Sequence, residues 1–346
     1  MTPGIGGDRG CGSGVSDFSG TTPMPSLRYD CHVHLVGNGL NGSGCWLRVE
    51  GLWLKGLSEV MRRAVGMPLP LTHRDFDEKY VEALSALIRG SYVDKALLLA
   101  QDEVYDDAGT KLAFGSFHVP NDYLFKVCAA HPEFVPAVSI HPGRKDALAE
   151  LERCLAGGAR ALKLLPNCQN VNCALPQYDE FWRRMATAGL PFLCHTGGEM
   201  TVPVINRSYQ DPRILRRPLE LGVKVIAAHS SGNSHFFDQN YFGELLKLMD
   251  EFPHLYADTS ALNSPVRSGV LKQVLAAGRP GRFLHGSDYP VPVGALWVRL
   301  RGLITGAQRR DAGRIDNLIE RDAFLKRSMG FAEGHFTQLG EILRPL

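Results

Sequence analysis

The chain has 346 residues, of which 44% are hydrophobic and 21% charged, so it is long enough to bury a large core. Its net charge of +2 and the absence of a Lys/Arg-rich block argue against nucleic acid or an anionic membrane as partner. The apolar runs are too short to span a bilayer.

The start of the chain lacks the order of charges and apolar residues that marks a signal peptide, and the eight cysteines form no C-x-x-C pair. These features predict a cytoplasmic protein with reduced thiols and a small-molecule substrate, and they leave homo-oligomerisation open. Residues 1–27 are rich in Gly, Ser, Thr and Pro, which predicts a flexible tail ahead of a single domain over residues 28–346.

Short apolar runs bounded by turn residues alternate with amphipathic stretches along this domain. Runs of this kind are typical of strands buried on both faces of a parallel sheet. The eight runs are Tyr29–Val36, Lys95–Gln101, Phe134–His141, Ala159–Leu165, Pro191–His195, Lys224–His229, Leu255–Thr259 and Phe283–Asp288. The clearest helical patterns between them are Phe76–Arg89, Asp146–Leu155, Tyr178–Ala188, Pro212–Leu221, Tyr241–Glu251 and Val266–Ala277.

Eight strands that alternate with helices, and a last helix after the eighth strand, predict a (β/α)8 TIM barrel. A doubly wound open sheet is the rival fold, but no G-x-G-x-x-G follows an early strand. The largest insertion, at about residues 37–72, follows the first strand and contains Trp46 and Trp53. A loop of this length on the catalytic face of a barrel is expected to cover or shape the active site.

Polar side chains gather at the carboxyl ends of the predicted strands, which is the catalytic face of a β/α barrel. His32 and His34 alternate on one strand and therefore share a face. Three further strands end at His195, His229 and Asp288. Imidazoles and a carboxylate that converge in this way suit Zn²⁺ or a similar divalent ion.

The same stretches resemble the amidohydrolase superfamily, and within it the amidohydrolase-related group, which includes hydrolases and decarboxylases related to aminocarboxymuconate semialdehyde decarboxylase. The matching motifs run in family order from Tyr29 to about Pro292. They are Asp30-Cys31-His32-Val33-His34-Leu35, Ser139-Ile140-His141-Pro142, Leu162-Lys163-Leu164-Leu165-Pro166, Leu193-Cys194-His195-Thr196-Gly197, Ala228-His229-Ser230-Ser231-Gly232 and Gly286-Ser287-Asp288-Tyr289-Pro290. The C-terminal helix departs from the pattern, with Arg321-Asp322-Ala323 where members often carry an Asn-Ala pair.

The resemblance implies a role for each matched residue. His32, His34, His195 and Asp288 would hold one divalent ion, with Zn²⁺ the first expectation. His229 would act beside the ion as a proton acceptor or would polarise the substrate, and Asp288 would serve as both ligand and base. A bound ion of this kind lowers the pKa of water from 15.7 to about 7.

Lys163 leaves two interpretations open. In family members with two metal ions, a lysine at this strand end is carboxylated and bridges the ions; His195 and His229 would then hold the second ion. Otherwise Lys163 is an ammonium that binds a substrate carboxylate or phosphate, with His141 and Arg207 as further candidates for substrate binding. Glu199 and Ser260, near other strand ends, could also contact the substrate.

Three functions follow from this pattern. The first is a metal-dependent hydrolase in which activated water attacks an amide, lactone or ester carbonyl. The second is a metal-dependent decarboxylase of an unsaturated or aromatic acid, and the third is a barrel that binds a metal or ligand without turnover. His285 lies three residues before Asp288, so strand alternation places it on the opposite face.

Overall fold

The structure is a computed structural model that describes residue 1 and residues 26–49, 56, 58–59, 62–63, 65–67 and 69–345. Most of the expected tail, and much of the insertion after the first strand including Trp53, lies outside the described residues. Among the helices of the described part, none has the length and apolar character needed to cross a membrane.

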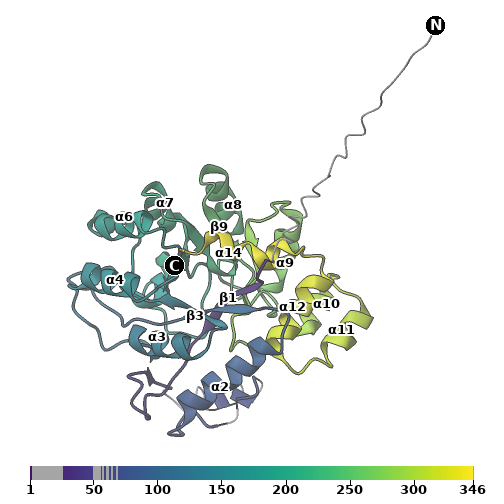
Figure 1. Ribbon diagram of the computed structural model, residues 1–346, viewed down its shortest axis with the longest axis horizontal. Coiled ribbons are helices and arrows are strands. Elements are labelled where there is room, and N and C mark those ends of the chain that lie inside the picture. Colours follow the sequence, from purple (N-terminus) through teal and green to yellow (C-terminus); the bar gives the residue numbers. More distant parts are fainter. Residues whose placement is uncertain are drawn as a thin grey trace.

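The core of the fold is an eight-stranded parallel sheet in the order β1-β3-β5-β6-β7-β8-β9-β10 (Figure 1). Each strand falls within one of the eight predicted runs, so this part of the prediction is confirmed. The strands are β1 (Tyr29–His34), β3 (Lys95–Leu99), β5 (Phe134–Val138), β6 (Ala161–Leu164), β7 (Phe192–Cys194), β8 (Val225–Ala227), β9 (Leu255–Asp258) and β10 (Phe283–Leu284).

Backbone hydrogen bonds between β1 and the segment that contains and follows β10 close the sheet into a barrel. Cys31 N donates to His285 O (2.9 Å), and His34 N donates to Tyr289 O (2.9 Å). Val33 and Tyr289 also form a parallel bridge. The protein is therefore a β/α barrel, with its first and last strands side by side.

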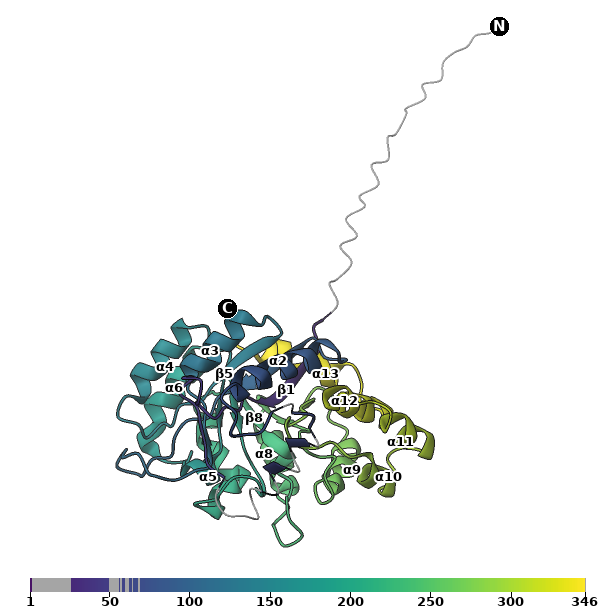
Figure 2. The ribbon, with the colours of Figure 1, turned by 90° about the horizontal axis from the view of Figure 1, so that it is seen from below.

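Helices surround the strands and extend beyond them at the end of the chain (Figures 1 and 2). The α-helices are α2 (Phe76–Arg89), α3 (Asn121–Ala130), α4 (Ala147–Ala156), α5 (Pro166–Gln169), α6 (Asp179–Thr187), α7 (Arg216–Glu220), α8 (Phe242–Glu251), α9 (Ser268–Ala276), α10 (Ala295–Leu300), α11 (Gly306–Ala312), α12 (Leu318–Ser328), α13 (Gly334–Thr337) and α14 (Leu339–Ile342). Short 3₁₀ helices are η1 (Pro176–Tyr178), η2 (Arg207–Gln210), η3 (Pro212–Leu215) and η4 (Ala228–Ser231).

Buried apolar side chains form two clusters, one outside and one inside the barrel. The outer cluster joins alternate strand residues such as Val33 and Leu98 to the surrounding helices. The inner cluster holds the other strand residues, such as Leu97 and Leu193, together with Leu339 and Ile342 of α14. Helix α14 therefore closes the barrel interior at the end where the strands begin. The polar groups lie at the opposite end.

Two strands in the loops on the catalytic face were not predicted. β2 (Trp46–Leu47) and β4 (Phe117–His118) form an antiparallel ribbon in which Leu47 faces Phe117 across the pair. Helix α3, which fills the connection between β3 and β5, was also not predicted. The ribbon joins the start of the insertion after β1 to the loop after β3.

Candidate active site

A register shift in β1 places both of its histidines at the site. The pairing of β1 with β3 shifts between Asp30 and Val33, which is the signature of a β-bulge. Cys31 lies in the inner cluster and Val33 in the outer one, so His32 and His34 turn inward above Cys31. The His32 and His34 ring centres lie 5.1 Å apart.

Asp258, the last residue of β9, orients the histidines and was not among the predicted site residues. Its Oδ2 accepts from His32 Nδ1 (2.8 Å), and its Oδ1 accepts from the backbone N–H of His229 (2.8 Å). Ser260 donates to Oδ1 through both its backbone N–H (3.0 Å) and its hydroxyl (2.5 Å). Because a carboxylate only accepts, the His32 proton lies on Nδ1, and the lone pair of Nε2 points toward Asp288 and Lys163.

Asp288 lies opposite the two histidines of β1. Its Oδ1 is 3.3 Å from both His32 Nε2 and His34 Nε2, and its backbone N–H donates to His32 O (2.9 Å). Two ligands at about 2.1 Å from a tetrahedral Zn²⁺ are about 3.4 Å apart. These three side chains therefore fit a divalent ion, and among the described residues they form one of two groups of His and Asp atoms close enough to hold one.

His229 and Asp288 both adopt backbone conformations that are unusual for residues other than glycine. Their φ angles are +57° and +66°, in the left-handed region. The bond from His229 N to Asp258 and the bond from Asp288 N to His32 hold these conformations in place. Such strain concentrates at functional sites, where the surrounding structure compensates for it.

His195 and His229 form a pair on the other side of the site. His229 Nε2 lies 3.2 Å from His195 Nδ1, and His229 Nδ1 lies 3.1 Å from the carbonyl oxygen of Ser260. Burial lowers the pKa of His229 well below its usual value and the pKa of His195 to about 3. Both imidazoles are therefore neutral and able to accept a proton or bind a metal ion.

Lys163 is completely buried at the end of β6, and its Nζ donates to His32 Nε2 at 3.0 Å. Burial lowers the pKa of its ammonium group, and the carboxylates of Asp258 and Asp288 act in the opposite direction. The amine thus lies beside the atom that would bind a metal ion. As an ammonium it can hold a substrate anion, or it can move away when a metal ion binds His32. If it is carboxylated, it can bridge two metal ions.

A cavity of about 510 Å³ opens over these groups. His34, Lys163, His195, His229 and Asp288 line its floor. Its walls are largely apolar, with Val36, Leu47, Val49, Phe114, Phe117, Met200, Val202, Pro203, Pro290 and Val291, joined by the polar residues Arg48 and Glu199. The described part of the insertion after β1 thus shapes the cavity through Leu47, Arg48 and Val49.

Three residues expected to contact the substrate, His141, Arg207 and Ser260, do not line this cavity. The imidazole of His141 contacts the carbonyl of Gln169 through Nε2 (2.9 Å) and the backbone N–H of Gly143 through Nδ1 (3.0 Å). Both of its ring nitrogens therefore already have hydrogen-bond partners within the fold. The side chain of Arg207 is 76% exposed and lies 3.7 Å from Asp238. His285 packs against Phe336 at a ring distance of 4.7 Å, on the opposite face of the strand from Asp288 as predicted.

The Glu199 carboxylate approaches His195 from the loop after β7. Its Oε2 lies 3.6 Å from His195 Nε2, and its side chain is 7% exposed. Burial alone would raise its pKa, but His195, Arg267 and Thr201 outweigh burial and lower the pKa to about 2. Glu199 is therefore a carboxylate at neutral pH.

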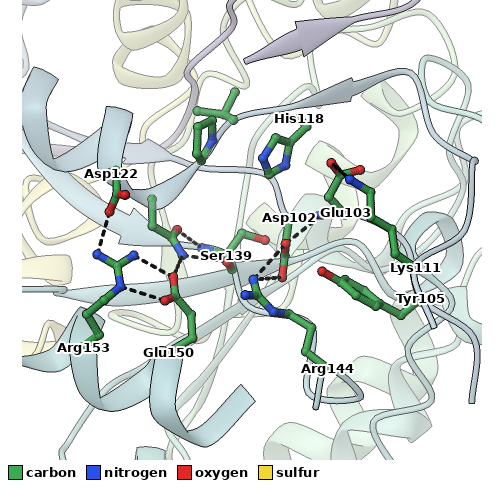
Figure 3. A pocket seen from close by; sticks show the side chains of 13 residues that line it. Asp102, Glu103, Tyr105, Lys111, His118, Asp122, Ser139, Arg144, Glu150 and Arg153 are labelled. Atoms are coloured by element: carbon green, nitrogen blue, oxygen red, sulfur yellow. Dashed lines mark hydrogen bonds and ion pairs between the residues drawn. The ribbon is translucent and has the colours of Figure 1, made fainter. Parts of the chain in front are cut away.

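A second cavity, of about 470 Å³, is lined mainly by charged side chains together with His118 of β4 (Figure 3). These charges pair with one another: Arg144 with Asp102 (3.1 Å), Lys111 with Glu103 (2.5 Å), and Arg153 with both Asp122 and Glu150. Because its charges are already satisfied, this cavity is a weaker candidate than the cavity over the histidines.

Comparisons with known proteins agree with the fold. A family model described as amidohydrolase matches residues 29–312. An uncharacterized TIM-barrel protein from Bordetella bronchiseptica is 17% identical, with a TM-score of 0.55 over 86% of this chain and 99% of that chain. A protein from Pseudomonas putida, proposed to be a 2-pyrone-4,6-dicarboxylic acid hydrolase, is 16% identical, with a TM-score of 0.50 over 89% and 99%. A search of curated proteins finds no match.

Proposed function

Because the chain belongs to the amidohydrolase family, whose members are metal-dependent enzymes that act on small molecules, we propose that it hydrolyses an amide, lactone or ester carbonyl. The observation that carries this proposal is the arrangement of His32 Nε2 and His34 Nε2, each 3.3 Å from Asp288 Oδ1. These three side chains would hold one divalent ion, with Zn²⁺ as the first choice for an imidazole and carboxylate set. His195 is the further ligand that the family pattern implies.

The ion, when bound, supplies a Lewis acid that activates water at neutral pH and polarises the carbonyl. The residues of the chain then supply proton transfer and orientation. The Asp288 carboxylate can take the proton of the attacking water, and the neutral His229, whose Nδ1 is 4.0 Å from Asp288 Oδ2, can polarise the substrate. The apolar walls exclude other water and position the body of the substrate.

Decarboxylation of an unsaturated or aromatic acid is the second candidate, because Lys163 places an amine on the cavity floor. As an ammonium, Lys163 would bind the substrate carboxylate, and it would serve hydrolysis of an acidic substrate equally well. If Lys163 is instead carboxylated, it would bridge two ions, and His195 and His229 would hold the second.

Metal analysis combined with a substrate screen tests this proposal. Purified protein should contain about one equivalent of divalent ion, whereas two equivalents with added mass on Lys163 would establish the bridged form. A screen of lactones, amides and unsaturated or aromatic acids, monitored for both hydrolysis and CO₂ release, separates the two reactions.

The double variant His32→Ala, His34→Ala should lose both the metal ion and the activity found in the screen. His73→Ala is the matched control because His73 lies on an exposed turn and its side chain is 46% exposed. Retained activity in the double variant, with the control unchanged, would refute the site.

A further inference from the structure

The Glu199 side chain is held rigidly by only one of its two oxygens. Its Oε1 accepts from the backbone N–H groups of Met200 (2.9 Å), Thr201 (2.5 Å) and Val202 (3.0 Å), and from the Thr201 hydroxyl (2.5 Å). The preceding residue is fixed as well, because Arg267 donates to the carbonyl of Gly198 at 2.6 Å. The carboxylate therefore cannot turn without breaking several hydrogen bonds at once.

The other oxygen, Oε2, has no hydrogen-bond donor among the described residues, although Glu199 lines the cavity. It lies 3.6 Å from His195 Nε2, a buried nitrogen that also lacks a hydrogen-bond partner within the described part of the chain. A carboxylate oxygen that faces a cavity without a protein donor accepts either from water or from a bound ligand, so Oε2 is available to a substrate.

The hydrogen bonds around His229 show that His195 Nε2 is an acceptor too. The Ser260 hydroxyl donates to Asp258, so His229 Nδ1 is left to donate to Ser260. His229 Nε2 then accepts from His195 Nδ1 at 3.2 Å. A neutral imidazole carries one proton, so His195 Nε2 presents a lone pair beside the free oxygen of Glu199.

We propose that Glu199 Oε2, which receives no proton from His195, recognises an N–H group next to the reacting carbonyl of the substrate. This inference rests on the proposed hydrolytic function and narrows its substrate class to amides, lactams and related N–H compounds, in preference to esters and lactones. One hydrogen bond to a charged acceptor corresponds to a preference of about 10- to 100-fold.

The test measures binding, so it does not depend on turnover. The probes are 3,4-dihydroquinolin-2-one, a bicyclic lactam, and its N-methyl derivative, which lacks the N–H. Isothermal titration of the zinc-loaded protein should give a Kd for the lactam at least 10-fold below that of the N-methyl compound.

Glu199→Gln distinguishes the hydrogen bond from a steric effect of the methyl group. Backbone N–H groups point at Oε1, so the glutamine oxygen stays there and its NH₂ group faces the cavity, replacing an acceptor with a donor. The preference should fall below about 3-fold, because only the steric part remains. Asp238→Asn makes the same acid-to-amide change in the neighbouring loop, where Asp238 accepts from Ser234 and His235, and should keep the wild-type preference.

Three results would overturn the inference: no preference in the wild-type protein, failure of the lactam to bind at millimolar concentration, or an equal loss for both probes in Glu199→Gln. The last result would point to a role common to all ligands, such as accepting from water. Failure of the proposed function is detected by a different experiment: the variant His32→Ala, His34→Ala would then retain its metal content or its activity.

Discussion

Asp258 does not line the cavity, yet it fixes the orientation of His32 and His229 at the site. It accepts from His32 Nδ1 on one oxygen and from the backbone of His229 on the other. An acceptor behind a metal-binding imidazole sets its tautomer and raises its basicity, and loss of such a partner typically costs 10- to 100-fold in metal affinity. Asp258, which lies outside the cavity, thus sets the tautomer of a histidine that would bind the metal ion.

Asp258→Asn is therefore expected to weaken zinc binding by about 10- to 100-fold. Three hydrogen bonds converge on Oδ1, so the amide oxygen stays with them and its NH₂ group faces His32 Nδ1. His32 must then move its proton to Nε2, where the ion would bind. Competition with a chromogenic chelator measures the change in affinity.

Asp30→Asn is the matched control for this prediction. Asp30 is also completely buried, and its Oδ1 accepts from the backbone N–H groups of His32 (3.1 Å) and Ser287 (2.9 Å), but it touches no imidazole nitrogen. Its zinc affinity should stay within about 3-fold of wild type. Equal losses in the two variants would mean that general distortion of the site, not the His32 tautomer, governs affinity.

The strands could be predicted from the sequence because each one is a short apolar run that alternates between the inner and outer clusters. The elements that were missed carry weaker patterns. Strands β2 and β4 have two residues each, too few to show a period, and α3 buries the polar Asn121 toward Ser139 and Glu150. The positions of polar residues at the strand ends predicted the residues of the cavity floor, and the resemblance to known enzymes implied their roles.

Contacts between distant parts of the chain could not be predicted in this way. His32 and Asp258 are separated by 226 residues, and only the closed barrel brings them together. An aspartate at the carboxyl end of a strand can be selected from the sequence as a candidate site residue. The sequence does not show which histidine that aspartate contacts. His141 shows the converse. Its position at a strand end predicted a side chain in the cavity, but its ring contacts the backbone carbonyl of Gln169 instead.

At the level of elements, α12 fixes the loops that follow β9 and β10. Lys326 is completely buried and donates both to the carbonyl of Gly286 (2.6 Å) and to Asp322 (2.6 Å). Asn263, in the loop after β9, donates to the other oxygen of Asp322. One buried ion pair thus anchors the segments that carry Ser260 and Asp288.

Lys326→Met should reduce the free energy of unfolding by about 3–5 kcal/mol, because it leaves Asp322 buried without its cation. The double variant Asp322→Asn, Lys326→Met removes both charges and should recover most of that loss. Urea denaturation followed by circular dichroism measures both values. If the double variant is no more stable than the single one, the hydrogen bond to Gly286, and not the buried charge, is what matters.

At the scale of the whole molecule, the proposed metal site lies where the barrel closes. His32 and His34 belong to β1, and Asp288 follows β10, so a bound ion would tie the first strand to the last. Backbone hydrogen bonds such as that from His34 N to Tyr289 O already make this connection. The ion would therefore add its binding free energy to the step that completes the fold.

Zinc at 100 times its Kd should raise the free energy of unfolding by about 2.7 kcal/mol, since it binds the folded barrel and not the open chain. Amide hydrogen exchange should show the added protection chiefly in β1 and in the segment after β10, which the ion joins directly. In the variant His32→Ala, His34→Ala, zinc should produce neither effect. A gain spread evenly over all eight strands, or one that persists in that variant, would place the binding site away from the closure.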